Sequence, residues 1–218
     1  MKKLSIAFNI ATLNEALRIE KCLLAIKNQN YPSELIEINI LDGGSKDNTL
    51  DICRKYGCNI FDNEEKLAEP GLALGHQITR SELIVYMATD NIIFDKNWIE
   101  KIIVPFQNKS VIASFCKVSI DDNDTFWSNY LNEDTDPFNR FIYMNSSHPD
   151  LFKNKYQIIE KDKNYIIYNF KAEDKPLIAL AQCTVVRKEF KRKNIFYDIE
   201  DINFAINSGF NVAYVINT

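Results

Sequence analysis

Hydrophobic and polar positions change period several times along the first half of the chain. Residues 4–11 form a nearly continuous apolar run, which predicts a buried strand. The next apolar positions follow the spacing i, i+3, i+4, i+7, which places them on one face of a helix. These positions are Ile19, Cys22, Leu23 and Ile26.

The same kind of pattern continues towards the C-terminus. Residues 36–40 alternate between isoleucine and polar side chains, and residues 83–87 form a short apolar run typical of a strand covered on both faces. Strands that alternate with helices predict an α/β fold with a mostly parallel central sheet flanked by helices. The further expected strands are 59–61, 111–120, 177–186 and 211–216, and the further expected helices are 71–79, 98–104 and 200–207.

Polar clusters follow three of the expected strands, at residues 12–15, 42–45 and 88–91. The carboxyl ends of parallel strands meet at one edge of a sheet, and α/β sheets bind ligands there. We therefore expect the three clusters to lie together at that edge.

Some of the polar residues also have a local interpretation. Asn14 can cap the first helix, and either Ser45 or Asp47 can cap the helix that follows the second strand. Arg187 and Lys188, directly after an expected strand, are interpreted as a solvated basic pair.

Residues 119–175 depart from the pattern. They are rich in Asp, Asn, Phe and Tyr and show poor periodicity. Because aromatic side chains at such density favour burial, we expect a long aromatic and acidic insertion with some structure of its own rather than a linker.

Composition narrows the class of protein. With 46% hydrophobic and 26% charged residues among 218, the chain suits one globular domain over residues 1–218. A net charge of −4 argues against a nucleic acid partner. The five cysteines, odd in number and without a C-x-x-C pair, favour free thiols in a reducing compartment. No run approaches the roughly 20 apolar residues of a transmembrane segment, so none is expected in this chain.

Several motifs together resemble a known family. The chain reads S-I-A-F-N-I-A-T-L-N-E-A from Ser5 and E-I-N-I-L-D-G-G-S-K-D-N-T from Glu37. These stretches resemble the opening of the family 2 glycosyltransferases, which have the GT-A fold of the nucleotide-diphospho-sugar transferase superfamily. Asp90 resembles the second Asp of their D-x-D motif, and Glu200-Asp201 resembles their E-D motif. The resemblance covers most of the chain except residues 119–175.

The resemblance implies a division of the chain and a set of ligand contacts. Residues 1–118 would be the nucleotide-sugar-binding half and residues 119–218 the acceptor-side half. Asp42 would accept a hydrogen bond from the base, and His76 stands where the family commonly has an arginine, although a structural histidine is the alternative. The implied nucleotide-sugar-binding residues are Thr12, Asn14, Glu15, Asp42, Gly43, His76, Thr89 and Asp90.

The resemblance also implies a divalent cation, Mg²⁺ or Mn²⁺, with Asp90 as its protein ligand. These hard cations prefer oxygen and keep several waters, so one carboxylate and two phosphate oxygens can suffice. The sequence departs from the family because Ala88 replaces the first Asp of D-x-D. Asn91 or Asp95 could compensate, although a plain surface role suits Asp95 better.

Asp201 is the expected catalytic base, with Glu200 as its catalytic neighbour or acceptor contact. A base that deprotonates the acceptor hydroxyl opposite the leaving group inverts the anomeric centre. We therefore expect an inverting glycosyltransferase of the hexosyltransferase type, with a nucleoside-diphosphate sugar as donor, a UDP-sugar favoured, and a hydroxyl as acceptor. The expected pathway is the synthesis of a cell-surface glycan or polysaccharide, with a glycan or lipid-linked acceptor. The expected location of the enzyme is the cytoplasm, and peripheral association with the inner membrane face is left open.

Two alternatives remain at this point. A glycosyltransferase-like nucleotide-binding domain with impaired catalysis would explain Ala88. A sugar-phosphate nucleotidyltransferase is also α/β and metal-dependent, but the G-x-G-T-R-L type of opening that marks this class is missing here.

Overall fold

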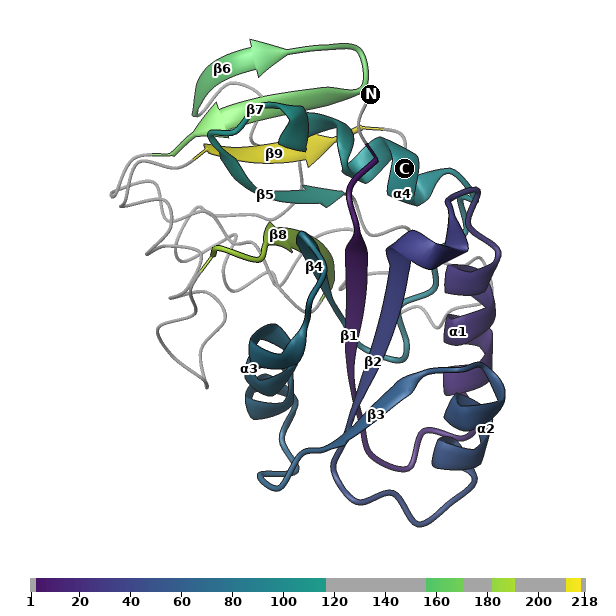
Figure 1. The fold of residues 1–218 in the computed structure, drawn as a ribbon. Helices are drawn as coiled ribbons and strands as arrows, with labels where there is room; N and C mark the ends of the chain where they lie inside the picture. The colour runs from purple at the N-terminus through teal and green to yellow at the C-terminus, as the bar shows by residue number, and fades with distance from the viewer. Residues whose placement is uncertain (1–2, 117–155, 171–181, 191–210, 217–218) are drawn as a thin grey trace, which may run out of the picture.

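The computed structural model of this chain describes residues 3–116, 156–170, 182–190 and 211–216. Within these ranges the strands form one nine-stranded sheet in the order β3-β2-β1-β4-β8-β5-β9-β7-β6 (Figure 1). The strands are β1 (Ile6–Thr12), β2 (Ile36–Asp42), β3 (Asn59–Asp62), β4 (Leu83–Met87), β5 (Val111–Cys116), β6 (Gln157–Lys161), β7 (Tyr165–Asn169), β8 (Gln182–Arg187) and β9 (Asn211–Val215). The helices are α1 (Ile19–Lys27), α2 (Thr49–Lys55), α3 (Ala68–Ile78) and α4 (Trp98–Ile102), with 3-10 turns at Ser33–Leu35 and Val104–Gln107.

The sheet is mixed, and most of its described strands run in one direction. β1 pairs in parallel with both β2 and β4, β2 with β3, and β5 with β9. β8 is antiparallel to β4 and β5, and β7 is antiparallel to β6 and β9. Among the described strands, only β7 and β8 therefore oppose the rest. The expected parallel pairing holds throughout β3-β2-β1-β4, and the antiparallel pairs of β7 and β8 make the whole sheet mixed.

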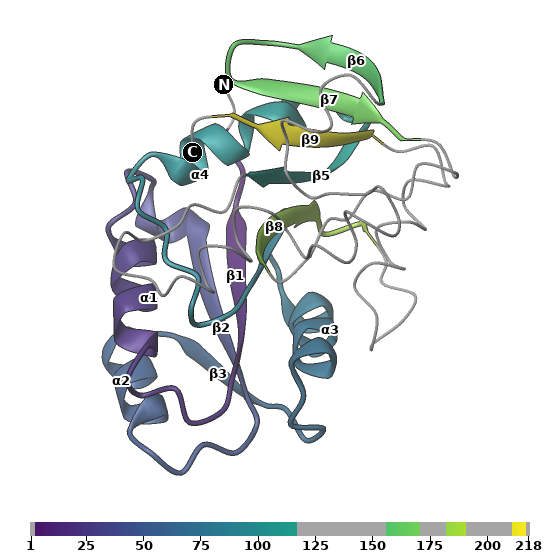
Figure 2. The same ribbon diagram turned by 180° about the vertical axis from the view of Figure 1, so that it is seen from behind.

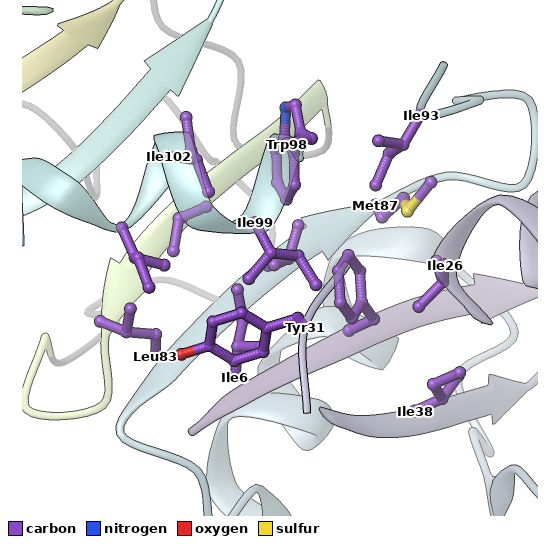
Figure 3. Packing of buried hydrophobic residues seen from close by; sticks show 14 of the residues in the cluster. Ile6, Ile26, Tyr31, Ile38, Leu83, Met87, Ile93, Trp98, Ile99 and Ile102 are labelled. Atoms are coloured by element: carbon purple, nitrogen blue, oxygen red, sulfur yellow. The ribbon is translucent and has the colours of Figure 1, made fainter. Parts of the chain in front are cut away.

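Helices cover both faces of the sheet, α1 and α2 on one face and α3 on the other (Figures 1 and 2). Successive strand residues point to opposite faces, so each face has its own apolar core. Ile6, Phe8 and Ile10 of β1 belong to the core on the α1 side, which also includes Trp98 and Ile99 of α4 (Figure 3). The four apolar positions predicted for α1 are all buried there.

The opposite face, under α3, contains buried polar side chains. Asn9 and Asn39 face each other in neighbouring strands, and Asn39 Nδ2 donates to Asn9 Oδ1 at 3.0 Å. Thr79, directly after α3, donates its hydroxyl to the same Asn9 oxygen at 3.0 Å. These bonds attach the C-terminal end of α3 to the middle of the sheet.

The described part of the expected insertion belongs to the main sheet. β6 and β7 form a hairpin whose second strand pairs with β9. Every residue of β6 is exposed. A strand without a buried face does not need alternating apolar and polar positions, and the sequence Q-I-I-E-K shows no such alternation. The expected helix 200–207 and the expected strand residues 117–120 and 177–181 lie outside the described residues.

Candidate functional site

The carboxyl ends of β1, β2 and β4 meet at one edge of the sheet. β1 lies between the other two, with Thr12 opposite Asp42 on one side and Ile10 opposite Met87 on the other. Asp90 follows Met87 by three residues. The carboxylates of Asp42 and Asp90 therefore follow strands on either side of β1 at the same edge, as the three polar clusters predict.

Asp42 is buried, and its carboxylate holds the turn that follows β2. Oδ2 accepts the amide hydrogens of Gly44 and Ser45, each at 2.9 Å, and Oδ1 accepts the Ser45 hydroxyl at 2.5 Å. The Thr12 hydroxyl lies 3.5 Å from the same Oδ1, at the limit of a hydrogen bond. These bonds fix the orientation of the carboxylate.

The two glycines after Asp42 are required by the backbone. Gly44 has a φ of +94°, in the region that favours glycine. At Gly43 an added Cβ would lie 3.3 Å from the Lys66 Cα, so a side chain there would crowd the approaching chain.

Asn14 connects two loops at this edge, the first loop (residues 13–16) and the second loop (residues 43–49). Its side-chain Oδ1 accepts the backbone amide of Lys46 at 2.8 Å, and its backbone amide donates to the Ser45 hydroxyl at 2.9 Å. The expected helix cap at Asn14 is wrong, because α1 begins only at Ile19 and has no side-chain cap. A φ of +57° places Asn14 in the left-handed region, and its side chain bonds the second loop instead.

Glu15 and Asp47 lie on either side of this contact. The Glu15 amide donates to Thr49 Oγ1 at 2.8 Å, and Glu15 Oε2 lies 3.7 Å from an Arg18 guanidinium nitrogen. Neither candidate is the N-cap of α2, which is Asn48 without a side-chain cap bond. Asp47, one residue earlier, accepts the Thr49 amide at 3.0 Å, whereas Ser45 bonds Asp42 and Asn14. The hydrogen bond from the Thr49 hydroxyl, joined by backbone amides, holds the pKa of Asp47 below its usual value.

Asp90 lies in a more open loop. Its side chain is exposed, and its Oδ1 accepts a hydrogen bond from Asn91 Nδ2 at 3.2 Å. Within the described residues no basic side chain forms an ion pair with it. An exposed carboxylate with oxygen lone pairs available fits a single protein ligand of a hard cation. Thr89 beside it is buried, and Ala88 accepts the Asn91 amide in a turn.

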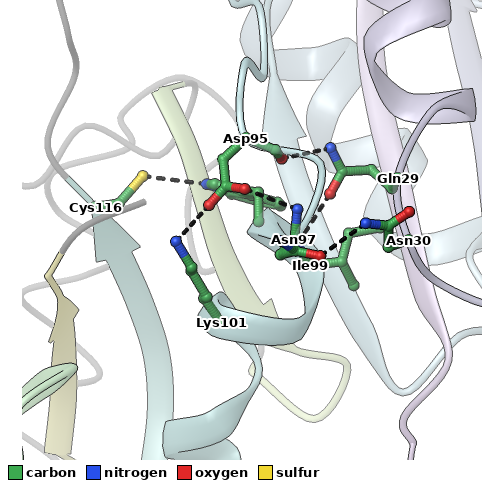
Figure 4. Close-up of polar contacts among 8 residues, drawn as sticks. Gln29, Asn30, Asp95, Asn97, Ile99, Lys101 and Cys116 are labelled. Carbon is green, nitrogen blue, oxygen red and sulfur yellow. Dashed lines mark hydrogen bonds and ion pairs between the residues drawn. The ribbon is translucent and has the colours of Figure 1, made fainter.

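Asp95 does not supply a second ligand in this arrangement. Its carboxylate accepts Lys101 Nζ at 2.5 Å and the Asn97 amide at 2.9 Å, while its carbonyl accepts Gln29 Nε2 at 2.8 Å (Figure 4). The bond from Lys101 lowers the pKa of Asp95. These contacts brace the start of α4 and attach the segment before it to the residues that follow α1, so Asp95 has a structural role.

His76 lies on α3 with both ring nitrogens engaged. Nδ1 contacts the Tyr86 hydroxyl, and Nε2 lies 3.1 Å from the Lys188 carbonyl oxygen. The ring also packs edge-on against Phe190, with centroids 6.4 Å apart. A phosphate or base could bond His76 only by replacing one of these partners, and its assignment to the nucleotide site stays a prediction.

Arg187 and Lys188 are not a solvated pair, so that interpretation is wrong. Arg187 donates to the carbonyl oxygens of Phe106 and Val111 at 2.6 and 2.7 Å, and burial lowers its pKa. Lys188 Nζ donates to the His76 carbonyl at the end of α3. Both cations bond backbone carbonyls from segments distant in sequence, which local patterns cannot reveal.

The expected catalytic pair, Glu200 and Asp201, lies outside the described residues. Among the residues that are described, no three His, Cys, Asp or Glu side chains group as a metal site. None of the helices in those ranges has the length and hydrophobicity needed to cross a bilayer. The five cysteines, all within the described ranges, form no disulfide.

Comparisons with known proteins identify the family. Residues 8–193 match the family model described as Glycosyl transferase family 2. The chain therefore belongs to glycosyl transferase family 2. Glycosyltransferase AglE of Haloferax volcanii is 42% identical over 60 residues, a stretch that spans 28% of this chain and 19% of AglE. The chain thus aligns with about a fifth of this relative's length.

Solved structures identify the fold. S. aureus TarS 1-349 in complex with UDP matches with a TM-score of 0.65 and 12% identity, over 99% of this chain and 59% of that chain. Glucosyl-3-phosphoglycerate synthase from Mycobacterium tuberculosis, in complex with Mn²⁺ and UDP-glucose, matches with a TM-score of 0.59 and 14% identity, over 97% and 68%. The expected GT-A fold is confirmed.

Proposed function

We propose that the chain is the catalytic domain of an inverting glycosyltransferase that moves a sugar from a nucleoside-diphosphate sugar to a hydroxyl acceptor. One observation carries the proposal. In a family 2 chain, Asp42 and Asp90 follow strands on either side of β1 at the ligand-binding edge of the sheet. A buried carboxylate of fixed orientation suits a directed hydrogen bond from the base ring of the nucleotide. An exposed carboxylate suits the coordination of a cation on the diphosphate.

A UDP-sugar is the donor that we favour. Two proteins of the same fold support this choice, since TarS forms a complex with UDP and the M. tuberculosis synthase with UDP-glucose and Mn²⁺. Asp42 would accept the N–H of the base beside the Thr12 hydroxyl. Asn14, Glu15 and Gly43 would line the same subsite, with Thr89 and His76 nearer the sugar and phosphates.

Asp90 would hold Mg²⁺ or Mn²⁺ through its exposed oxygens. When bound, such a cation offsets the negative charge that develops on the leaving diphosphate. Ala88 supplies no oxygen from its side chain, so the phosphates and water would complete the coordination.

Asp201 would take the proton from the acceptor hydroxyl as its oxygen attacks the anomeric carbon. The bond from that carbon to the diphosphate breaks on the opposite side, so the centre inverts in one displacement. Glu200 would contact the acceptor or support Asp201.

In this proposal residues 1–118 bind the donor and residues 119–218 receive the acceptor, a cell-surface glycan or lipid-linked sugar. The free cysteines fit a reducing cytoplasm, with or without peripheral contact with its membrane.

Transfer and donor hydrolysis assays with UDP-sugars and Mn²⁺ test the proposal. We expect Asp201→Ala to lower kcat by about 10²- to 10⁴-fold, the usual contribution of a general base. Equal turnover by wild type and variant would refute the base assignment.

Ala88 favours a second candidate, a family 2 domain that binds nucleotide without catalysis. Mn²⁺-dependent UDP binding with no turnover across a panel of donors and acceptors would select that candidate instead.

A further inference from the structure

The first loop is held to the second by side chains rather than by backbone pairing. Three consecutive backbone amides of the first loop each donate to a different side chain of the second loop. The pairs are Asn14 with Ser45 Oγ at 2.9 Å, Glu15 with Thr49 Oγ1 at 2.8 Å, and Ala16 with Asp47 Oδ2 at 3.1 Å. The second loop therefore supplies the acceptors that an irregular loop otherwise finds in water.

Thr49 and Asp47 form the centre of this contact. Thr49 is fully buried, and its hydroxyl donates to Asp47 Oδ1 at 2.5 Å while it accepts the Glu15 amide. Asp47 uses Oδ1 for Thr49 and Oδ2 for Ala16. Thr49 Oγ1 accepts the Glu15 amide and Asp47 Oδ2 accepts the Ala16 amide, so loss of either side chain leaves a donor of the first loop without its acceptor.

The contact extends to Asp42. The Ser45 hydroxyl donates to Asp42 Oδ1 and accepts the Asn14 amide. The Gly43 amide donates to the Thr12 carbonyl at 2.8 Å, which continues the pairing of β1 and β2 into the loops. The orientation of the Asp42 carboxylate and the path of the first loop are thus set by one hydrogen-bonded unit.

We propose that Asp47 and Thr49 are positioning residues for the nucleotide of the donor. They touch no ligand themselves, and they hold the first loop beside Asp42 so that binding does not have to order it. Ordering of a loop on binding weakens affinity, so a loop ordered in advance binds more tightly. This inference rests on the proposed function, because it takes the edge beside Asp42 as the nucleotide site.

Thr49 allows a matched pair of variants. Thr49→Val keeps the shape of the buried side chain and removes the hydroxyl, whereas Thr49→Ser retains the hydroxyl. Asp47→Ala removes the carboxylate at an exposed position and leaves no cavity in the core. Asp51→Asn is the control on the same helix, because the Asp51 side chain is 78% exposed and pairs with Arg54 alone among the contacts described.

The experiment combines calorimetric titration of UDP with Mn²⁺ and hydrogen exchange of the amides at residues 14–16. We expect Thr49→Val and Asp47→Ala to speed exchange at these amides and to raise the Kd for UDP about tenfold. Thr49→Ser and Asp51→Asn should stay within about twofold of wild type in Kd. In transfer assays the KM for the donor should rise while kcat is kept, which a general loss of folded protein would not produce.

The outcomes separate this inference from the proposed function. If the amides exchange faster but the Kd for UDP equals that of wild type, the contact is only a structural brace and the inference is overturned, while the proposed function stands. If wild type itself does not bind UDP with Mn²⁺, the donor proposal fails and the inference fails with it. Should Thr49→Val not fold, Asp47→Ala decides the question by the same measurements.

Discussion

The two sides of the sheet edge differ in how their loops are held. Beside β2, the first and second loops share side-chain hydrogen bonds at 2.8–3.1 Å, and the buried Asp42 bonds Ser45 of the second loop. Beyond β4, the loop at residues 88–91 makes few polar contacts within the described chain. They are one turn bond, a side-chain bond between Asp90 and Asn91, and a weak thiol contact from Cys183. The loops beside β2 therefore satisfy their hydrogen-bonding groups by contacts with each other, whereas the loop after β4 leaves the Asp90 carboxylate exposed.

This difference matches the two ends of a nucleoside diphosphate. A base is recognised by shape and by a few directed hydrogen bonds, which a fixed loop supplies. A diphosphate carries negative charge, so in the proposed function it would meet Asp90 only through a cation, for which an exposed carboxylate with open oxygens is a suitable partner. Changes on the two sides should therefore affect different quantities.

The largest effect is expected on the open side. Asp90→Ala should lower kcat/KM by about 10³-fold, because the electrostatic stabilisation of the leaving diphosphate is lost. The thermal midpoint should stay unchanged, since Asp90 is exposed and bonds only its neighbour among the described residues. Asp95→Asn is the control, with a lower midpoint and unchanged donor affinity. A normal rate in Asp90→Ala would place the cation elsewhere.

On the bonded side, Asp42→Ala should reduce both stability and nucleotide affinity. Removal of the carboxylate leaves the Gly44 and Ser45 amides and the Ser45 hydroxyl without their acceptor. We expect a loss of about 1–3 kcal/mol in the free energy of unfolding, measured by urea denaturation. Unchanged stability would show that the loop does not depend on Asp42.

A smaller effect is expected at Asn14. Asn14→Ala removes the acceptor of the Lys46 amide and puts a less tolerant residue at a φ of +57°, which should cost about 1–2 kcal/mol of unfolding free energy. Asn14→Gly loses the same bond but suits the backbone, so its loss should be smaller. If urea denaturation shows the same loss of unfolding free energy for Asn14→Ala and Asn14→Gly, the left-handed backbone conformation contributes nothing to the effect.

The smallest effect is a pH dependence from Asp47. The folded protein holds the pKa of this carboxyl below its ordinary value of 3.8, chiefly through the Thr49 hydroxyl. Its contribution to stability is therefore present above that value and is lost as the pH falls through the lower folded-state pKa. Between about pH 5 and pH 3, the thermal midpoint of wild type should fall slightly more than that of Asp47→Asn. Parallel curves would contradict this assignment.

Sequence patterns located most of the described elements. The strand expected at residues 83–87 is β4 with the same bounds, and the apolar face of α1 is buried as expected. Both depend on burial of periodic apolar positions, which is a local property of the sequence. The order of strands and helices likewise placed Asp42 and Asp90 at one edge.

Contacts between distant segments were not predictable in the same way. Asparagine is a residue type that often caps helices, yet the partners of Asn14 are Ser45 and Lys46, about thirty residues later. The sequence alone assigns no role to Thr49, although Thr49 ends the D-G-G-S-K-D-N-T stretch and anchors the first loop. Such roles depend on which loops the sheet brings together.

Calorimetric titration of uridine and UDP, each with and without Mn²⁺, tests the central claim that Asp42 and Asp90 bind opposite ends of one nucleoside diphosphate. The account predicts that Mn²⁺ tightens the binding of UDP but not of uridine, and that Asp90→Ala abolishes this gain. It also predicts that Asp42→Ala weakens both ligands. An equal Mn²⁺ gain in Asp90→Ala, or uridine binding that is indifferent to Asp42→Ala, would contradict the claim.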